Sequence, residues 1–231
     1  MILSKDCFLY DNCKKFSKGN CKLEDNSFCI KLFKLDYLYK ESLLTEKQRN
    51  YIPLRTDADG TDKIEFSHLK NIENNIEDFV KSGNSLYIYS HICGNGKTAW
   101  SIRLIQAYLN SIWYKCDMSC KALFINVPNF FIQLKNNISE NVEYIEHIKH
   151  NIYNADIVVW DEIGTKNLTS FEHEHLLSFI NNRIDNNKCQ IFTSNLSPEE
   201  LRDGVGDRLY SRVVTKSEKI EFKGLDKRGI I

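Results

Sequence analysis

The chain has 231 residues and a mass of 27.0 kDa, with 42% hydrophobic residues, 27% charged residues, 10 Gly and 3 Pro. This composition excludes disordered, collagen-like and low-complexity proteins, and the length predicts one ordinary domain with a smaller addition. Because 31 basic residues balance 31 acidic ones, the net charge gives no argument for nucleic acid binding. No apolar run is long enough to span a bilayer and the first residues do not resemble a signal peptide, so we expect a cytoplasmic protein without membrane contact.

The first part of the chain is rich in cysteine. Four of the eight cysteines lie within 29 residues, at Cys7, Cys13, Cys21 and Cys29. In a reducing cytosol this clustering favours a metal site over disulfides, and four thiolates could bind a structural zinc ion that replaces a hydrophobic core. The spacing lacks the C-x2-C pairs of the commonest zinc sites, so reduced cysteines without a metal remain an alternative.

A change of composition divides the chain near residue 60. An apolar helical pattern runs from Ile30 to Leu44, and Pro53 with an Asp-rich turn then indicates a linker. We therefore expect a Cys-rich domain and linker over residues 1–60 and the main domain over residues 61–231.

Beyond the linker, short apolar runs alternate with amphipathic stretches, which is typical of an α/β fold with a parallel sheet. Strands are expected at 86–89, 122–127, 156–160, 190–193 and 219–222. Helices are expected at about 67–82, 98–114, 129–137, 140–150 and 171–187. Thr169 and Ser170 could cap the last of these helices.

The first expected strand runs into a turn that a helix follows at once, with the sequence Gly94-Asn95-Gly96-Lys97-Thr98. This context fits a phosphate-binding loop, in which backbone amides and the helix N-terminus bind phosphate oxygens. Lys97 would reach the β and γ phosphates, and the Thr98 hydroxyl would bind Mg²⁺. His91 stands where the pattern has its first glycine, which could weaken nucleotide binding or slow hydrolysis. A turn without function is the alternative.

The third expected strand ends in two adjacent carboxylates, Asp161 and Glu162. Asp161 would hold Mg²⁺ through water, and Glu162 would orient and deprotonate the attacking water. Such a pair can also be two solvated turn residues, but the phosphate-binding loop upstream favours a nucleotide hydrolase.

Polar residues further along the chain could complete the site. Asn195 follows the fourth expected strand and could hold the attacking water against the γ-phosphate, or simply cap the helix that begins near Ser197. Arg208 and Arg212 are four residues apart and would share one helix face. In a ring or filament, one of them could stabilise the transition state in a neighbouring copy; otherwise the pair is a solvated surface.

In order along the chain, residues 94–98, 159–164, 193–197 and 207–212 resemble the motifs of AAA+ ATPases. The pattern resembles in particular the replicative helicase loaders of the DnaC/DnaI type, including phage-encoded versions, with IstB-type transposition helpers as near relatives. The resemblance covers about residues 65–231. It implies a three-layer AAA+ core with little or no lid, ATP and Mg²⁺ as cofactors, and an ATP-dependent ring or spiral that loads a hexameric DnaB-type helicase onto single-stranded DNA.

The resemblance also implies roles for single residues. It assigns Gly94, Asn95, Gly96, Lys97 and Thr98 to Walker A, Asp161 and Glu162 to Walker B, Asn195 to sensor 1, Arg212 to the arginine finger with Arg208 as its companion, and Arg228 weakly to sensor 2. For the N-terminal segment it implies a zinc-binding domain that docks on the helicase, with the apolar residues between Phe28 and Tyr39 as a docking surface or as packing around the zinc. It also implies contact with single-stranded DNA. Phe130 and Phe131 could stack on bases with Lys135 near a phosphate, but core packing is the favoured alternative for at least one of the two rings.

Three other functions remain open from the residues alone. An IstB-type transposition helper would use the same ATPase site, but would not require the Cys-rich segment. A small-molecule kinase would need an acceptor pocket and no carboxylate to activate water, so Asp161 with Glu162 and the arginine pair argue against it. An adaptor that binds nucleotide without hydrolysis would be insensitive to the loss of Glu162.

Overall fold

The computed structural model describes residues 27–49, 60–136, 142–165 and 168–227. Cys7, Cys13, Cys21 and Arg228 lie outside these ranges. Five parallel strands form one sheet in the order β2-β3-β4-β1-β5. Their bounds are β1 (Ser85–Tyr89), β2 (Ala122–Asn126), β3 (Ile157–Asp161), β4 (Cys189–Ser194) and β5 (Glu218–Glu221).

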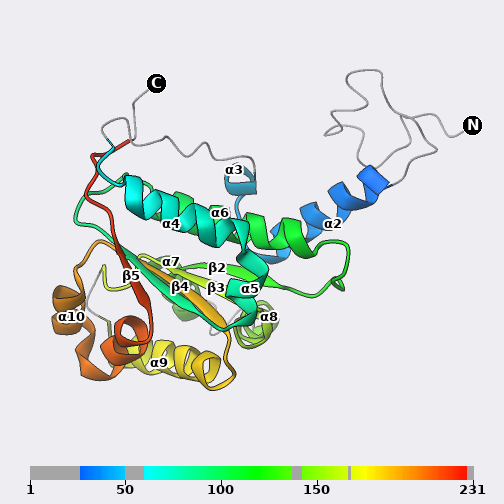
Figure 1. Ribbon diagram of the computed structural model, residues 1–231. Coiled ribbons are helices and arrows are strands. Elements are labelled where there is room, and N and C mark those ends of the chain that lie inside the picture. The colour runs from blue at the N-terminus through cyan, green and yellow to red at the C-terminus, as the bar shows by residue number, and fades with distance from the viewer. Residues whose placement is uncertain (1–26, 50–59, 137–141, 166–167, 228–231) are drawn as a thin grey trace, which may run out of the picture.

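Helices cover both faces of the sheet, which gives three layers (Figure 1). One face carries α2 (Ser27–Glu41), α4 (Lys63–Asn74), α5 (Ile76–Lys81) and α6 (Lys97–Ile112). The other carries α7 (Val127–Asn136), α8 (Val142–Asn154), α9 (Ser170–Asp185), α10 (Pro198–Tyr210) and the π-helix η3 (Ser211–Thr215). A short helix, α3 (Glu46–Arg49), contacts α6 through a 2.7 Å hydrogen bond from Gln106 Nε2 to the Gln48 carbonyl. Within the described ranges no helix combines the length and apolar character needed to cross a bilayer.

Strand β3, which lies between β2 and β4, is buried along its whole length. Ile157 and Val159 pack with the α6 layer, whereas Val158 and Trp160 pack with the α9 layer. Successive side chains of a strand point to opposite faces, so a strand that is covered on both sides reads as a continuous apolar run. The predicted parallel α/β sheet is therefore confirmed, and all five expected strands lie within two residues of their observed bounds.

The observed helices differ more from their predicted bounds than the strands do. The segment expected as one helix at 67–82 forms α4 and α5, which meet at Asn75 (φ −117°, ψ 32°). The Asn75 side chain donates to the Asn71 carbonyl at 3.0 Å, a local bond that competes with continued helix. At the start of α9, Thr169 forms a reciprocal capping box with Glu172, so the predicted cap is confirmed. No helix follows β5 in the described residues.

Helix α2 packs on the main domain. Leu35 and Leu38 are buried in the same core as α6, although Ile30 and Phe33 are about half exposed. The chain after α2 is fixed to the sheet, because the Phe124 N–H donates to the Ser42 carbonyl at 2.9 Å. The apolar residues of α2 thus divide between packing on the sheet layer and exposure, and the boundary near residue 60 stays a prediction.

Candidate functional site

The loop between β1 and α6 surrounds one side of a cavity of about 310 Å³. Residues 93–99 line the cavity, together with Glu162 after β3 and residues 193–195 at the end of β4. Gly96 has φ +112°, a left-handed conformation in which a side chain would be strained. No side chain caps α6, so its first amides are left for a ligand. This is the geometry that binds phosphate at a helix N-terminus.

Lys97 lies at the centre of the loop and is only 7% exposed. Its Nζ donates to the carbonyls of Ser90 (3.2 Å) and Ile92 (3.0 Å). The buried Asn95 amide donates to the Ser90 hydroxyl at 2.6 Å. A phosphate could replace the two carbonyls as the partner of the ammonium group, and the exchange would be favoured because a hydrogen bond between two charged groups is stronger.

Asp161, at the end of β3, is 3% exposed and accepts two hydroxyl hydrogen bonds on one oxygen. Thr98 donates at 2.8 Å and Thr193 at 2.7 Å. Burial raises the pKa of the Asp161 carboxyl, and the hydrogen bonds from Thr193, Thr98 and Asn126 oppose that rise. The Walker A threonine and the Walker B aspartate are therefore in direct contact.

A magnesium ion fits this donor set. Mg²⁺ in nucleotide sites is bound by one or two protein oxygens, with waters and phosphate oxygens completing the shell. The Thr98 hydroxyl and the Asp161 carboxylate supply these oxygens beside the phosphate-binding loop. In the parts of the chain that the structure describes, no group of three His, Cys, Asp or Glu side chains could hold a metal alone. Cys29 is half-buried, and the other three cysteines of the expected zinc site lie outside the described residues.

Glu162 is exposed and has φ +62°, which is uncommon for a residue with a side chain. Two neighbouring strands fix it in this conformation. Its N–H donates to the Thr193 hydroxyl on β4 at 3.1 Å, and its Oε2 accepts from Asn126 Nδ2 on β2 at 3.1 Å. This backbone conformation places Glu162 at the wall of the cavity. There its carboxylate would polarise an attacking water.

Thr193 and Asn126 are site residues that the sequence interpretation missed. Asn126 also reaches Asp161 Oδ2, at 3.4 Å. Each lies at or next to the carboxyl end of a strand beside β3. A signal was present, because polar residues at strand ends gather at one edge of a parallel sheet. Asn195, which was predicted, is half-buried and lines the same cavity.

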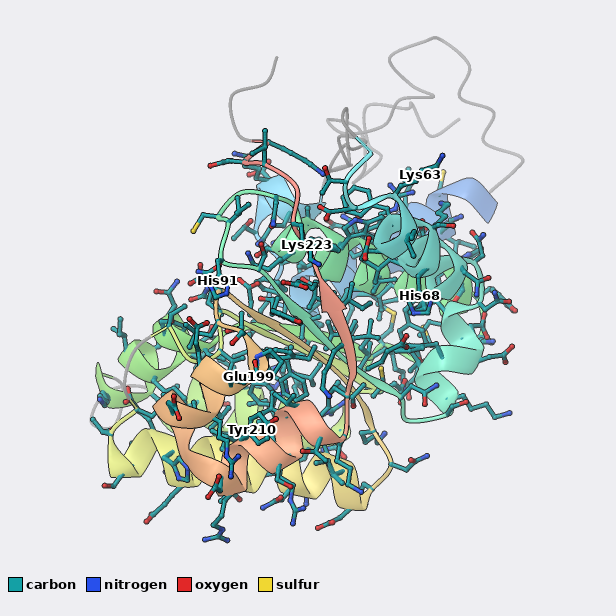
Figure 2. All side chains as sticks on the ribbon, turned by 60° about the vertical axis from the view of Figure 1, so that its left-hand side comes forward. Lys63, His68, His91, Glu199, Tyr210 and Lys223 are labelled. Carbon is teal, nitrogen blue, oxygen red and sulfur yellow. The ribbon has the colours of Figure 1, made fainter. Side chains whose placement is uncertain are left out.

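His91 does not strain the loop. Its φ is not positive, so the position of the pattern's first glycine takes a conformation that any residue adopts. The ring is exposed, and Nδ1 lies 3.5 Å from Glu200 Oε2 at the start of α10. Figure 2 shows His91 above the first turn of α10, where Glu199 is labelled.

The two arginines lie outside the cavity of their own chain. Arg208 lies in the last turn of α10 and Arg212 lies in η3, and both side chains are exposed. They line one depression of about 280 Å³ with Asp207 and Asn181. Arg212 Nε donates to Asn181 Oδ1 at 2.7 Å. Arg208 and Arg212 therefore lie on the same side of the molecule, as predicted. A π-helical turn, and not one short α-helix, joins them.

Of the two interpretations of Phe130 and Phe131, stacking on bases is wrong and packing in the core is correct for both rings. The two rings are 5% and 0% exposed, because α7 begins directly after β2 and turns its apolar side onto the sheet. The third member of this set, Lys135, has its Nζ 3.1 Å from Oε1 of the buried Glu172.

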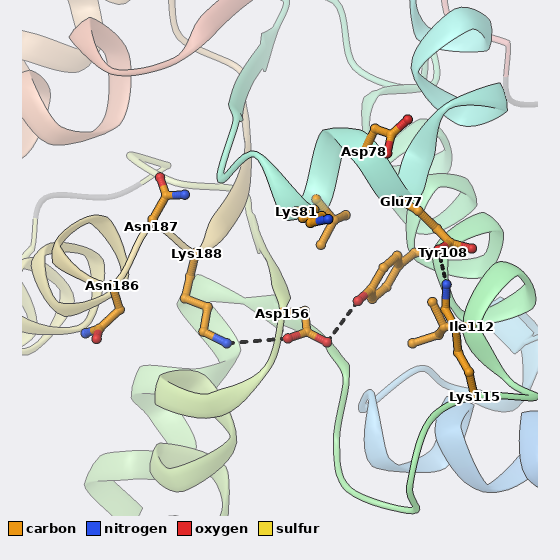
Figure 3. A pocket seen from close by; sticks show the side chains of 11 residues that line it. Glu77, Asp78, Lys81, Tyr108, Ile112, Lys115, Asp156, Asn186, Asn187 and Lys188 are labelled. Atoms are coloured by element: carbon orange, nitrogen blue, oxygen red, sulfur yellow. Dashed lines mark hydrogen bonds and ion pairs between the residues drawn. The ribbon is translucent and has the colours of Figure 1, made fainter.

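A larger cavity of about 580 Å³ lies at the opposite edge of the sheet, where the strands begin (Figure 3). Its charges are largely paired within the chain. Lys115 contacts Glu77, and Asp156 accepts from Lys188 at 3.4 Å and from the Tyr108 hydroxyl at 2.8 Å. Of the residues that the structure describes, no glycine lines this cavity, so it lacks the phosphate-binding loop of the smaller one.

The comparisons with known proteins agree with this site. The sequence model of the bacterial DnaA ATPase domain matches residues 65–216. The chain belongs to this family. The match includes the phosphate-binding loop, both carboxylates and both arginines, so ATPase chemistry and a relation to DNA replication are shown at the level of the family. The comparison with curated proteins found no match.

Solved structures share the fold. The DnaC helicase loader is 18% identical with a TM-score of 0.60, covering 78% of this chain and 100% of its own. The structure of DnaI is 20% identical with a TM-score of 0.53, covering 74% and 94%. AMPPCP-bound DnaA from Aquifex aeolicus is 20% identical with a TM-score of 0.55, covering 78% of this chain and 51% of its own. The resemblance to AAA+ proteins of the DnaC/DnaI type is thus confirmed.

Proposed function

We propose that this chain is an ATPase that loads a hexameric replicative helicase onto single-stranded DNA. The observation that carries the ATPase part is the contact of Thr98 with the buried Asp161, next to Glu162 at the wall of the loop cavity. The fold of the DnaC helicase loader, which this chain matches over the whole of that loader's structure, supports the helicase part.

In this proposal the loop binds the phosphates of ATP. The amides of residues 94–98 and the Lys97 ammonium bind the β and γ phosphates, and Thr98 and Asp161 hold Mg²⁺. Bound Mg²⁺ neutralises charge that develops on the phosphates. Burial keeps Asp161 in a setting of low dielectric, which strengthens its interaction with a cation.

Glu162 acts as the base for water. Its carboxylate is exposed to the cavity, accepts one hydrogen bond from Asn126 and keeps its second oxygen for the water. Asn195, from the end of β4, lines the same wall and orients the water or the γ-phosphate. The carboxylate, the amide and the phosphate loop thus come from three adjacent strands.

The exposed arginines act in a second copy of the chain. Arg208 and Arg212 do not line the cavity of their own chain, yet both are exposed on one side of the molecule. An arginine supplied by a neighbour would stabilise the charge of the transition state, so that hydrolysis would require assembly.

The N-terminal segment docks on the helicase. Four thiolates at Cys7, Cys13, Cys21 and Cys29 would bind one Zn²⁺, and the exposed Ile30 and Phe33 would extend the docking surface along α2. Because Leu35 and Leu38 are part of the main core, a test of docking should remove only residues 1–26 and keep α2.

Size-exclusion chromatography tests the function. The purified chain is mixed with a hexameric replicative helicase in the presence of ATP, ADP or no nucleotide, and the chain without residues 1–26 is run in parallel. Co-elution that requires residues 1–26 is the expected result. If a competent helicase gives no complex in any state, helicase loading is wrong for that pair, and an ATP-dependent complex with a transposase would instead indicate the transposition helper.

A further inference from the structure

The segment after β5 lies against the phosphate-binding loop. The Phe222 N–H donates to the Tyr89 carbonyl at 2.9 Å, and the Lys227 N–H donates to the Gly94 carbonyl at 3.0 Å. The buried Asn95 amide lies 3.5 Å from the Phe222 carbonyl. In Figure 1 this red segment runs beside the start of α4, and Figure 2 labels Lys63 and Lys223 on that side of the molecule. The two ends of the main domain therefore meet at the loop.

Asp62 fastens this segment. It is 1% exposed and directly precedes α4, but its side chain does not cap that helix. Instead, Asp62 Oδ1 accepts the N–H of Lys223 at 2.7 Å and the N–H of Gly224 at 3.1 Å, and Oδ2 accepts the Gly224 N–H at 3.0 Å. An aspartate at this position ordinarily accepts from the first amides of its own helix. Here the carboxylate instead accepts hydrogen bonds from two amides that are 161 and 162 positions further along the chain.

Aromatic rings continue the contact down to α6. Phe66 meets Phe222 edge-on with centroids 5.2 Å apart, and meets Trp100 with centroids 5.4 Å apart. Lys227 Nζ lies 4.2 Å from the centre of the Phe66 ring. A Cβ added at Gly96 would lie 4.0 Å from Trp100 Cδ1, so this ring packs beside the loop.

The bond from Lys227 to Gly94 has a consequence for phosphate binding. In a trans peptide the carbonyl and the following N–H point in opposite directions, and the described residues contain no cis peptide. Holding the Gly94 carbonyl toward the C-terminal segment therefore turns the Asn95 N–H away from that segment. An amide fixed before the ligand arrives binds an anion with less loss of entropy.

We propose that Asp62 is a positioning residue for the nucleotide site, because it clamps residues 222–227 against the phosphate-binding loop and so preorganises the loop amides for a nucleoside triphosphate. The inference rests on the proposed binding of ATP. It adds a part of the site that lies outside the Walker motifs and comes from both ends of the main domain.

Two pairs of variants test the clamp in the full chain. Asp62→Asn weakens the acceptor, and Asp185→Asn, an exposed aspartate at the end of α9, is its control. Lys223→Pro removes one of the donated N–H groups, and Lys223→Ala keeps it. The Lys223 pair keeps the test valid if Asp62→Asn does not fold. Binding is titrated with a fluorescent ATP analogue, and tryptic cleavage of the segment is followed by mass spectrometry.

We expect Asp62→Asn and Lys223→Pro each to weaken nucleotide binding by about fivefold or more, whereas the two controls bind as the unchanged chain does. We also expect Asp62→Asn to speed cleavage after Lys227, and after Lys223, whose following amide is tied to Asp62. Faster cleavage with unchanged nucleotide affinity would overturn the positioning role. Unchanged cleavage would overturn the clamp itself. Failure of the unsubstituted chain to bind the analogue would instead overturn the proposed ATP binding, and this inference with it.

Discussion

The Thr193 hydroxyl joins the two carboxylate residues of the site: it donates to Asp161 at 2.7 Å and accepts the N–H of Glu162 at 3.1 Å. A hydroxyl can make both bonds because it is one donor and also an acceptor. One side chain of β4 thus contacts both the proposed magnesium ligand and the backbone of the proposed catalytic base.

Replacing Thr193 with valine keeps the shape of the side chain and removes both bonds. We expect ATP hydrolysis to fall by about tenfold to a hundredfold, because Glu162 and Asp161 lose their alignment. Nucleotide binding should change much less. Phosphate release and analogue titration measure the two effects, with Thr215→Val at the exposed end of η3 as control. Equal losses in both variants would contradict the role of Thr193.

Replacing Glu162 with glutamine should separate binding from hydrolysis. The amide keeps the size of the side chain but cannot accept a proton, so we expect turnover to drop by about a hundredfold or more while ATP still binds. Glu199→Gln, on the exposed first turn of α10, is the matched control. Turnover that survives the Glu162 change would show that another group activates the water.

The raised pKa of Asp161 predicts a pH dependence of stability. Because burial raises the folded pKa above the ordinary value of 3.8, the folded state binds this proton more tightly than the unfolded state. The contribution of Asp161 to stability is therefore greatest at low pH and falls as the pH rises from about that value through the folded pKa. Above its folded pKa the carboxylate is an unfavourable buried charge until a cation binds.

Asp161→Asn should therefore raise the free energy of unfolding at pH 7 in the absence of nucleotide and Mg²⁺. This increase in the free energy of unfolding should become smaller as the pH is lowered toward 3.8. The variant should also lose the stabilisation that Mg²⁺ adds to bound ATP. Denaturant unfolding at several pH values measures the first effect and thermal unfolding the second. A variant that is less stable than the parent chain at pH 7 would show that the hydrogen bonds outweigh the burial of charge.

Cysteine accessibility gives a test that does not depend on catalysis. Cys93 is exposed and lines the loop cavity, whereas Cys120 and Cys189 are buried. Burial raises the pKa of the Cys120 thiol to about 12, so its reactive thiolate is rare at neutral pH. We expect N-ethylmaleimide to modify Cys93 before Cys120 and Cys189, and Mg²⁺-ATP to protect Cys93, as followed by mass spectrometry of each cysteine. Labelling of Cys93 at the same rate with and without ATP would place the nucleotide elsewhere.

Replacing the buried Arg183 should lower the free energy of unfolding strongly. It is fully buried and donates to four carbonyls, those of Ile152 (2.7 Å), Ala155 (2.9 Å), Asp156 (3.3 Å) and Cys189 (2.7 Å). Arg183→Met should cost about 3–5 kcal/mol, because several buried carbonyls lose their donor. The exposed Arg202→Met should lower the free energy of unfolding much less, because ion pairs at the surface contribute little. Denaturant unfolding compares the two, and similar losses would contradict the prediction.

The sequence sufficed for the sheet and for the loop because their signals are local. A buried strand is a short apolar run, and the phosphate-binding loop is contiguous from Gly94 to Thr98. Thr193 and Asn126 were missed because their role depends on the strand order, which puts β2 and β4 on either side of β3. Neither neighbour can be deduced from the spacing of residues along the chain.

Two other differences have the same origin. The ring chemistry of Phe130 and Phe131 suits both base stacking and core packing, and the sequence favoured the core for only one of them, but the fold buries both. The contact of Asp62 with the amides of Lys223 and Gly224 joins opposite ends of the main domain. Such long-range packing overrides a local pattern, and one sequence does not reveal it.

Helix α2 packs against α6, the helix that follows the phosphate-binding loop. It packs in the same core as α6, Tyr39 accepts a 2.7 Å hydrogen bond from Asn110, and Lys34 donates to the Cys116 carbonyl at 3.4 Å. The first residue of α6 is Lys97. The two bonds from α2 lie at the other end of α6 or just beyond it, so α2 is part of the helical layer that supports the sheet and not a separate arm.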